Sequence, residues 1–488
     1  MKENYEAIKM KETDYQKLVE PYKDQALEVL GNLIRINSVY DEKTKSKVNP
    51  FGKGVEQALA YIAKIGFELG FKVDRCDNYC TELSYGEGKV LDIYAHLDVV
   101  PVNLEKWTKD PFSMLIEDGN IYGRGSCDDK GPGVACLFAT KALIDNLKIK
   151  GYRVRFIFGG NEERGSLCLD HYFNCIKKGY PELGFSPDAD YPLIYAEKSM
   201  ANYELSYDIS LPFVQPFGVG DALNIVLDNA TVTLNEFATK KEEKRFISAL
   251  KKYAKSVKGL KASYSITDHI LSFVGLSAHG SMPYAGINAG LHMLAFLGEF
   301  FDIDLLSFVA DCYMDGRGSK LHLNFRDKVF NESTYNVGKI IYTGGQLKVY
   351  VNARFPVNAD ISDVLAKARK GGKCHLEVLS TSKGFVFDKK SPLISILLDS
   401  YQKETGDLKS QPLAIGGGTY ARESKNSVAF GAAFAKRDYR MHGDDEYFPL
   451  SDFYANMQIY AHAIDKLGEY LAKLGEENNE TQTQKVDE

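Results

Sequence analysis

The hydrophobic pattern of the chain alternates between helical spacing and short apolar runs. Apolar residues recur at helical intervals over about 15–36, 54–69, 133–143, 392–401 and 450–474, which predicts amphipathic helices. Short apolar runs at about 71–75, 83–85, 91–94, 152–158 and 193–196 predict buried strands. Because the two kinds of element alternate along the chain, we expect an α/β fold in which helices flank a mostly parallel, mixed sheet.

The pattern changes near residue 200 and again near residue 385. Between about 199 and 384, strands rich in Val, Leu and Tyr are interspersed with helices, which is typical of an inserted α+β domain. We therefore expect a catalytic domain in two parts, 1–198 and 385–474, with a lid domain at 199–384 inserted between them. The polar end of the chain, 475–488, predicts a disordered tail.

Composition and charge exclude several functional classes. The 488 residues are 44% hydrophobic, enough for two or more domains, and the net charge of −6 does not favour a nucleic-acid partner. The N-terminus lacks the apolar core of a signal peptide, and no stretch approaches the roughly 20 apolar residues of a membrane span. The 8 cysteines form no zinc-knuckle pattern. We expect a cytoplasmic protein with reduced thiols and no membrane association.

The apolar run that begins at Leu91 ends in two polar residues, His96 and Asp98. Residues i and i+2 of a strand face the same way, so both side chains point into one space. The carboxyl end of a parallel strand is also where open α/β sheets place their ligands. A lone histidine at a strand end is more often structural, so a functional interpretation requires further polar residues nearby.

Carboxylates and a second histidine follow other predicted elements. Asp128 precedes the helix predicted over 133–143, where the helix dipole favours a negative charge. Glu162 and Glu163 follow the strand at 152–158, Asp188 lies in a proline-bounded turn, and His442 lies in a turn before the last helix. These positions predict a centre in which several loops contribute donor atoms.

The donor types are those of a site for two divalent metal ions. Two zinc ions about 3.5–4 Å apart need one shared carboxylate, with roughly one histidine and one carboxylate for each ion. The ligands that we assign are His96, Asp128, Glu163, Asp188 and His442, with Asp128 as the bridge. Asp98 is assigned to hold the His96 ring. Zinc is our first choice, with manganese and cobalt as alternatives because mixed histidine and carboxylate sites accept all three.

Glu162 is left over by this assignment. A carboxylate beside the metals that is not itself a ligand can take a proton from a bridging water and later give it to a leaving amine. Glu162 is therefore the candidate general base. The set as a whole predicts hydrolysis of an amide bond by a metal-activated water.

Five segments resemble the co-catalytic dizinc peptidases, a family that includes peptidase T, carnosinase, aminoacylase and carboxypeptidase G. They are His96-Leu97-Asp98-Val99-Val100-Pro101, Gly123-Arg124-Gly125-Ser126-Cys127-Asp128-Asp129-Lys130-Gly131, Glu162-Glu163, Pro187-Asp188-Ala189 and Met441-His442. The form Asp128-Asp129-Lys130-Gly131-Pro132, the long insertion and the segment 416–422 are most similar to the dipeptidase V branch. The resemblance spans about residues 15–470. It implies the metal and base roles given above and a cis peptide bond after Asp128.

The resemblance also implies substrate-binding residues outside the metal centre. His279, in Ala278-His279-Gly280-Ser281, matches a lid residue that reaches the scissile carbonyl as an oxyanion donor. Asn224 and Arg354 match lid residues that fix the substrate, and Arg354 suits a bidentate grip on a terminal carboxylate. With the backbone of Gly417 and Gly418, these residues imply a short peptide substrate with a free C-terminus.

These observations favour a monomeric, metal-dependent dipeptidase. Two alternatives stay open: an N-acyl-amino-acid deacylase or carboxypeptidase that uses the same metals, and a non-catalytic relative that acts as a binding module. The chain departs from the family pattern at Asn161, where relatives often carry an acid. This change removes one negative charge beside Glu162 and leaves the pH profile open.

Overall fold

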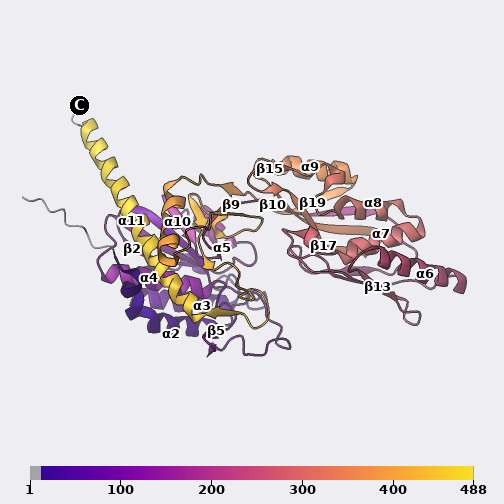
Figure 1. Ribbon diagram of the computed structural model, residues 1–488, viewed down its shortest axis with the longest axis horizontal. Coiled ribbons are helices and arrows are strands. Elements are labelled where there is room, and N and C mark those ends of the chain that lie inside the picture. The colour runs from indigo at the N-terminus through magenta and orange to yellow at the C-terminus, as the bar shows by residue number, and fades with distance from the viewer. Residues whose placement is uncertain (1–12, 487–488) are drawn as a thin grey trace, which may run out of the picture. The chain divides into compact units, whose positions relative to one another are not determined.

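A computed structural model describes residues 13–486, with the backbone alone for 478–486. The chain forms two compact units, labelled by their elements in Figure 1. Unit 1 contains the residues through Tyr195, Phe387–Leu413 and the chain from Thr419 onward, and unit 2 contains Ala196–Val386 and Ala414–Gly418. The two main boundaries lie at Tyr195/Ala196 and Val386/Phe387, where the sequence analysis expected 198/199 and 384/385. The grouping of 414–418 with unit 2 was not predicted.

The main sheet has the strand order β1-β2-β6-β3-β7-β22-β9-β20, and β21 pairs with β9. Strands β1, β2, β3, β6, β7 and β22 belong to unit 1, whereas the residues of β20 belong to unit 2. The central strands β6, β3, β7 and β22 are parallel, whereas the pairs toward both edges are antiparallel. The mixed sheet is confirmed, but parallel pairing is confined to its centre. Parallel neighbours need long crossover connections, such as α4 between β3 and β6, whereas a short turn suffices between β1 and β2. The strands are β1 Lys72–Asp74, β2 Cys80–Gly86, β3 Lys89–His96, β6 Tyr152–Gly159, β7 Leu183–Ser186, β9 Ile194–Glu197, β20 Phe385–Val386, β21 Leu413–Ile415 and β22 Ser427–Ala429.

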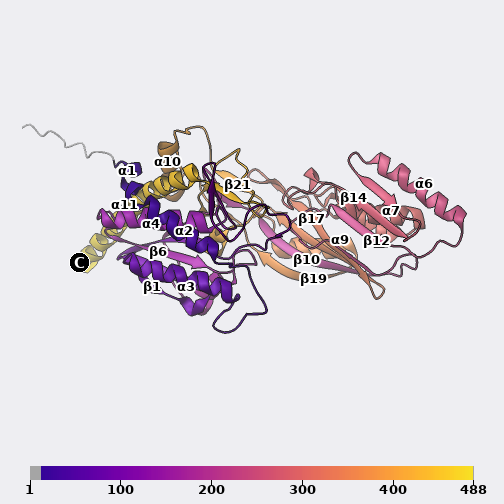
Figure 2. The same ribbon diagram turned by 90° about the horizontal axis from the view of Figure 1, so that it is seen from below.

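Helices cover both faces of this sheet. Helices α4 and α11 pack on β3 and β6, while α3 packs on β1 and β2, and Figure 2 shows β6 between α4 and α3. Helix α4 is buried along nearly its whole length because α2 and α11 also pack against it, which explains its apolar sequence on all sides. The helices of unit 1 are α1 Tyr15–Val19, α2 Lys23–Arg35, α3 Lys53–Glu68, α4 Lys130–Asp145, α5 Leu167–Asp170, α10 Pro392–Thr405 and α11 Leu450–Val486.

Two small strand groups hold the loops at the carboxyl edge of the sheet. Strand β24 pairs with β5, which pairs with β4, so the segment before β24 lies beside the segment after β5. Strands β8 and β23 form a short parallel pair. The bounds are β4 Leu115–Glu117, β5 Asn120–Tyr122, β8 Ala189–Asp190, β23 Ala432–Ala433 and β24 Tyr447–Pro449.

The end of the chain differs from the expected disordered tail. Helix α11 continues through 475–486, and residues 487–488 lie outside the described part of the chain. This segment is rich in Glu, Gln and Lys, which are good helix formers. Extending an existing helix is far easier than nucleating a new one, so polarity alone was a poor guide here.

Unit 2 combines antiparallel sheets with helices around its own apolar core. A five-stranded sheet has the order β11-β17-β18-β10-β19, and a three-stranded sheet has the order β12-β14-β13. Helix α9 packs on β10 and β19, and α7 packs on β12, β14 and β17. The strands are β10 Ser199–Asp208, β11 Phe217–Val219, β12 Asn229–Thr233, β13 Lys261–Tyr264, β14 Ile270–Val274, β15 Arg326–Asp327, β16 Asn331–Glu332, β17 Thr334–Thr343, β18 Gln346–Phe355 and β19 His375–Ser382; the helices are α6 Lys240–Ser256, α7 Ala289–Phe301, α8 Asp304–Tyr313 and α9 Ile361–Gly372.

Within the described residues, no helix is both long and apolar enough to cross a bilayer.

A buried ion pair joins the two central strands of unit 1. Both carboxylate oxygens of Asp92 on β3 accept hydrogen bonds of 2.7 Å from Arg155 on β6, through Nε and Nη2. The hydroxyl of Tyr94 also donates to Asp92 at 2.7 Å. Both partners of the ion pair are buried, so neither charge can be solvated if the other is removed.

We predict that Arg155→Met lowers the free energy of unfolding by about 3–5 kcal/mol, because it leaves the Asp92 carboxylate buried without its partner. Urea denaturation followed by circular dichroism measures the change. Arg153→Met is the matched control on the same strand, since Arg153 is half-buried and lies 3.3 Å from Glu82. It should cost about 0–1 kcal/mol. Equal losses in the two variants would contradict the prediction.

Candidate metal centre

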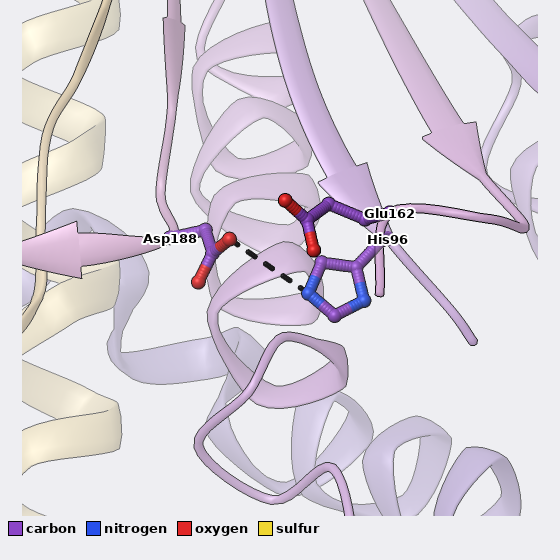
Figure 3. A group of neighbouring side chains, drawn as sticks. All are labelled: His96, Glu162 and Asp188. Carbon is purple, nitrogen blue, oxygen red and sulfur yellow. Dashed lines mark ion pairs between the residues drawn. The ribbon is translucent and has the colours of Figure 1, made fainter. Parts of the chain in front are cut away.

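Three parallel strands bring polar side chains to one edge of the unit 1 sheet. Strand β3 pairs with β6, with His96 opposite Gly159, and with β7 on its other side. His96 ends β3, Glu162 follows β6 and Asp188 follows β7. Figure 3 shows these three side chains converging, and one donor atom of each lies within 4.8 Å of the others. The carboxyl ends of parallel strands thus gather the residues that the sequence separates.

Asp128 lies between two histidines. Its Oδ1 is 2.9 Å from Nε2 of His96, and its Oδ2 is 2.9 Å from Nε2 of His442. His442 Nε2 is also 3.1 Å from Oε1 of Glu163, and His96 Nε2 is 3.8 Å from Oδ2 of Asp188, the ion pair dashed in Figure 3. One carboxylate therefore presents a different oxygen to each imidazole, which is the geometry of a bridging ligand.

The backbone of Asp98 fixes the tautomer of His96. Nδ1 of the ring lies 2.9 Å from the carbonyl oxygen of Asp98, and a carbonyl can only accept, so Nδ1 carries a proton. In the neutral ring, Nε2 then offers its lone pair toward Asp128 and Asp188. The orientation of His96 is thus set by the main chain two residues further on. The peptide bond between Asp128 and Asp129 is cis, as the resemblance implied.

The carboxylate of Asp98 has a different partner from the one expected. Its Oδ1 is 3.7 Å from His96 Nδ1, too far for a hydrogen bond. Oδ1 and Oδ2 instead accept the backbone N–H groups of Glu162, at 3.0 Å, and Glu163, at 3.2 Å. Asp98 therefore orients the His96 ring through its carbonyl and holds the glutamate pair through its side chain.

The acids at this edge shift one another's pKa. Burial, followed by the negative charge of Asp128, raises the pKa of Asp188 to about 7. Burial also raises the pKa of Asp98 to about 6, and burial with the nearby charges of Asp188 and Glu163 raises the pKa of Glu162 well above its ordinary value. The site therefore holds more negative charge than a protein interior tolerates without bound cations or protons.

The histidines respond in the opposite sense. Burial lowers the pKa of His442, but hydrogen bonds to Asp128 and Glu163 outweigh it and raise that pKa to about 11. Burial also lowers the pKa of His96, but the hydrogen bond and the charge of Asp128 outweigh it, so that pKa lies well above its ordinary value. Burial raises the pKa of Asp128, but the two histidines outweigh it and hold that pKa well below its ordinary value. The carboxylates thus favour the protonated form of both imidazoles, and the imidazoles favour the charged form of Asp128.

Two candidate substrate-binding residues lie on neighbouring segments of unit 2. Ile225 and His279 form an isolated antiparallel bridge, and the N–H of Gly280 donates to the carbonyl of Asn224 at 2.6 Å. The ring of His279 lies 2.6 Å from the hydroxyl of Ser281 through Nδ1. The structure thus brings Asn224 and His279 together although 55 positions separate them in the sequence.

Arg354 connects the glycine segment to this region. It is buried at the end of β18, where its Nε donates to Asn352 at 2.8 Å and its Nη1 donates to the carbonyl of Gly416 at 2.6 Å. A Cβ built on Gly416 would lie 2.9 Å from Cβ of Ser281, so the backbone there passes close to the His279 turn. Gly417 and Gly418 follow directly in the same loop of unit 2.

Sequence reasoning missed one residue that supports this region. The buried side-chain amide of Asn336, on β17, donates to the carbonyls of Leu223 and Ile225 at 2.7 and 2.8 Å. These carbonyls flank Asn224, so Asn336 fixes the loop that carries it. An asparagine inside an apolar strand is the only sequence signal, and it does not identify a partner more than 100 residues away.

A model of the peptidase family M20/M25/M40 matches residues 93–466 of the chain. The chain belongs to this family. The resemblance inferred from the sequence motifs is therefore confirmed, and the matched range includes every residue of the candidate metal centre.

Full-length relatives in the M20 family support this membership. The Bacillus subtilis (strain 168) protein named "Putative dipeptidase YtjP" is 34% identical over 461 residues, which cover 91% of this chain and 97% of the relative. A Staphylococcus haemolyticus protein with the same kind of name is 31% identical and covers 93% of this chain and 99% of its own length.

Solved structures show the same fold at lower identity. The dipeptidase Dug1p of Saccharomyces cerevisiae has a TM-score of 0.57 and 14% identity, covering 93% of this chain and 98% of its own. Human carnosine dipeptidase 1 has a TM-score of 0.55 and 14% identity, covering 93% of this chain and 98% of its own. The M20 metallo-carboxypeptidase Sso-CP2 of Sulfolobus solfataricus has a TM-score of 0.56 and 18% identity, covering 91% of this chain and 99% of its own. The α/β fold is that of M20 proteins.

The donor set fits the metal dependence of M20 peptidases. Two groups, His96 with Glu162 and Asp188, and His96 with Asp128 and Glu163, can each bring three donor atoms within 4.8 Å. Imidazole nitrogen and carboxylate oxygen are ordinary ligands of Zn²⁺ and Mn²⁺. Burial and neighbouring acids raise the pKa of Asp188 and of Glu162, and a divalent ion beside them would favour their charged forms. The residues present therefore suit divalent ions.

We predict that Asp98→Ala loosens the Glu162–Glu163 turn, because two backbone N–H groups lose their acceptor at a cost of about 1–3 kcal/mol each. Hydrogen exchange of a peptide spanning 160–167 should become about tenfold faster or more. Asp98→Asn is the matched control: its one oxygen can accept one N–H, so the increase should be intermediate. Unchanged exchange in Asp98→Ala would refute this assignment.

Proposed function

We propose that the chain is a metal-dependent dipeptidase that hydrolyses short peptides with a free C-terminal carboxylate. The observation that carries this proposal is the Asp128 carboxylate, which faces His96 with one oxygen and His442 with the other at 2.9 Å each. Relatives that cover more than 90% of the chain carry the name dipeptidase, which supports this substrate class over others in the family.

The proposed ligands divide into two sets that share Asp128. His96 and Asp188 hold one ion, and His442 and Glu163 hold the other, in keeping with the distances among these side chains. Divalent ions, when bound there, lower the pKa of water and polarise a substrate carbonyl. We propose zinc as the resident metal, with manganese or cobalt as the alternatives, because the ligands are nitrogen and oxygen donors.

Glu162 is the proposed general base. It lies within 4.8 Å of the donor atoms of His96 and Asp188, yet the two ligand sets are complete without it. The backbone N–H of Glu162 donates to the carboxylate of Asp98, which fixes the main chain that carries the Glu162 side chain. In this position Glu162 takes the proton of the attacking water and delivers it to the leaving amine.

The residues of unit 2 are proposed to bind the substrate. Arg354 binds the terminal carboxylate, which suits a buried guanidinium already held in place by Asn352 and Gly416. His279 is the proposed donor to the scissile carbonyl oxygen, and Asn224, beside it in the fold, fixes the substrate with Gly417 and Gly418. We further propose that the protein is a monomer, because one chain carries the complete candidate set. We also propose that it is located in the cytoplasm.

A panel of free dipeptides and N-acetylated amino acids tests the substrate class. We expect free dipeptides to be hydrolysed at higher kcat/KM than the acetylated set, with activity lost on chelation and restored by added metal. Preference for the acetylated set would instead support a deacylase.

Glu162→Gln should bind metal like the unchanged enzyme but lose at least about a thousandfold in kcat. Chelator-insensitive or absent hydrolysis by the unchanged enzyme would favour a binding module.

We predict that metal affinity rises with pH. In the metal-free protein the pKa of His442 is raised to about 11, so its ring is protonated at neutral pH and must release that proton to bind a metal. Affinity should therefore rise about tenfold per pH unit for each proton released, from about pH 7 to 9. Calorimetric titration of chelator-treated enzyme in buffers of different ionisation enthalpy measures both quantities. A pH-independent affinity with no proton release would contradict this prediction.

A further inference from the structure

Glu446 differs from the two acids that precede it. Its side chain is fully buried, whereas Asp444 is half-buried and Asp445 binds Thr108 and Lys109 at the other side of the loop. A buried carboxylate needs several donors to replace its hydration, so the partners of Glu446 identify what it does.

All four donors to Glu446 come from the segment that leads to Asp128. Oε2 accepts from Nη1 of Arg124 at 2.7 Å and from the N–H of Gly125 at 3.1 Å. Oε1 accepts from the N–H of Cys127 at 2.9 Å and from the N–H of Asp128 itself at 3.2 Å. One side chain therefore fixes the backbone on which the proposed bridging ligand stands.

The same contacts fix the loop that carries His442. Arg124 donates through Nη2 to the carbonyl of Gly443 at 2.9 Å, and the N–H of Gly123 donates to the carbonyl of Glu446 at 3.1 Å. The side chain of His442 is 53% exposed, so packing does little to hold it. The position of His442 relative to Asp128 depends on these connections between the two loops.

We propose that Glu446, together with Arg124, is a positioning residue that sets the separation of Asp128 and His442 and so controls affinity for the metal ion bound by His442, Glu163 and Asp128. This inference rests on the proposed function and goes beyond it, because neither residue contacts the metal or the substrate. Glu446 lies four residues after one ligand and bonds to the backbone of the other. The ion held by His96 and Asp188 depends less on it, because only Asp128 is shared.

The test counts Mn²⁺ bound by chelator-treated enzyme, with free Mn²⁺ detected by electron paramagnetic resonance. The unchanged enzyme should bind two ions. In Glu446→Gln, an amide NH₂ group replaces one acceptor oxygen and faces N–H donors. One of the two ions, the one proposed to bind His442 and Glu163, should therefore lose about 10–100-fold in affinity, while the other ion changes little. Asp444→Asn is the matched control, since it removes one charge from the same loop and should bind both ions normally.

Two further measurements separate positioning from loss of fold. The only tryptophan, Trp107, lies with its ring centroid 5.1 Å from the guanidinium carbon of Arg124, so its emission should shift in Glu446→Gln and not in Asp444→Asn. If Glu446→Gln does not fold, Arg124→Lys decides the question. It keeps Glu446 and its three backbone donors but cannot bridge Glu446 and Gly443, so the same ion should bind more weakly.

The possible outcomes are distinct. Normal binding of both ions by Glu446→Gln, or by Arg124→Lys where the first variant does not fold, would overturn the inference and leave the proposed function intact. Equal loss of both ions from a folded variant would also overturn it, because Glu446 would then support the whole centre without selectivity. Failure of the unchanged enzyme to bind Mn²⁺, Zn²⁺ or Co²⁺ would overturn the proposed function and this inference with it.

Discussion

Repulsion among carboxylates at one edge of a buried sheet is the constraint on which the centre of unit 1 depends. Burial first, and then the charge of neighbouring acids, raises the pKa of Asp188 and of Glu162, while the carboxylates around the two histidines raise the pKa of His96 and of His442. Nε2 of His442 lies within 3.1 Å of both Asp128 and Glu163, so a proton on this nitrogen would face the carboxylates that are proposed to bind a metal with it. Protons and metal ions therefore compete for the same set of lone pairs, and the fold is compatible with either.

Further acids hold this centre in place without belonging to it. The carboxylate of Asp98 accepts two backbone N–H groups from the glutamate turn. Glu446 accepts three from the segment that ends at Asp128. These two carboxylates are engaged by donors of neighbouring loops, so they orient the chain that carries the proposed ligands.

The sequence predicted the centre better than it predicted the supporting contacts. His96, Glu162 and Glu163 follow predicted strands, and parallel pairing brings such strand ends together. Asp188 was placed only in a proline-bounded turn, and the strand before it, β7, was not predicted. His442 follows no strand of the main sheet, and it was included because it lies in a turn and supplies a second imidazole donor to the set. Glu446 could not be told from its acidic neighbours, because its burial arises from the pairing of β24 with β5, which local sequence does not encode.

The path of the chain also explains why the positions of the proposed substrate-binding residues were harder to predict from the sequence. Gly417 and Gly418 lie between segments of unit 1 in the sequence, yet Arg354 binds the carbonyl of Gly416 and the loop belongs to unit 2. Asn224 and His279 are joined by their backbones through one β-bridge. The proposed substrate-binding residues thus share one unit and the proposed metal ligands share the other. Each set can then be rigid within itself, because its members are connected by hydrogen bonds that do not depend on the other unit.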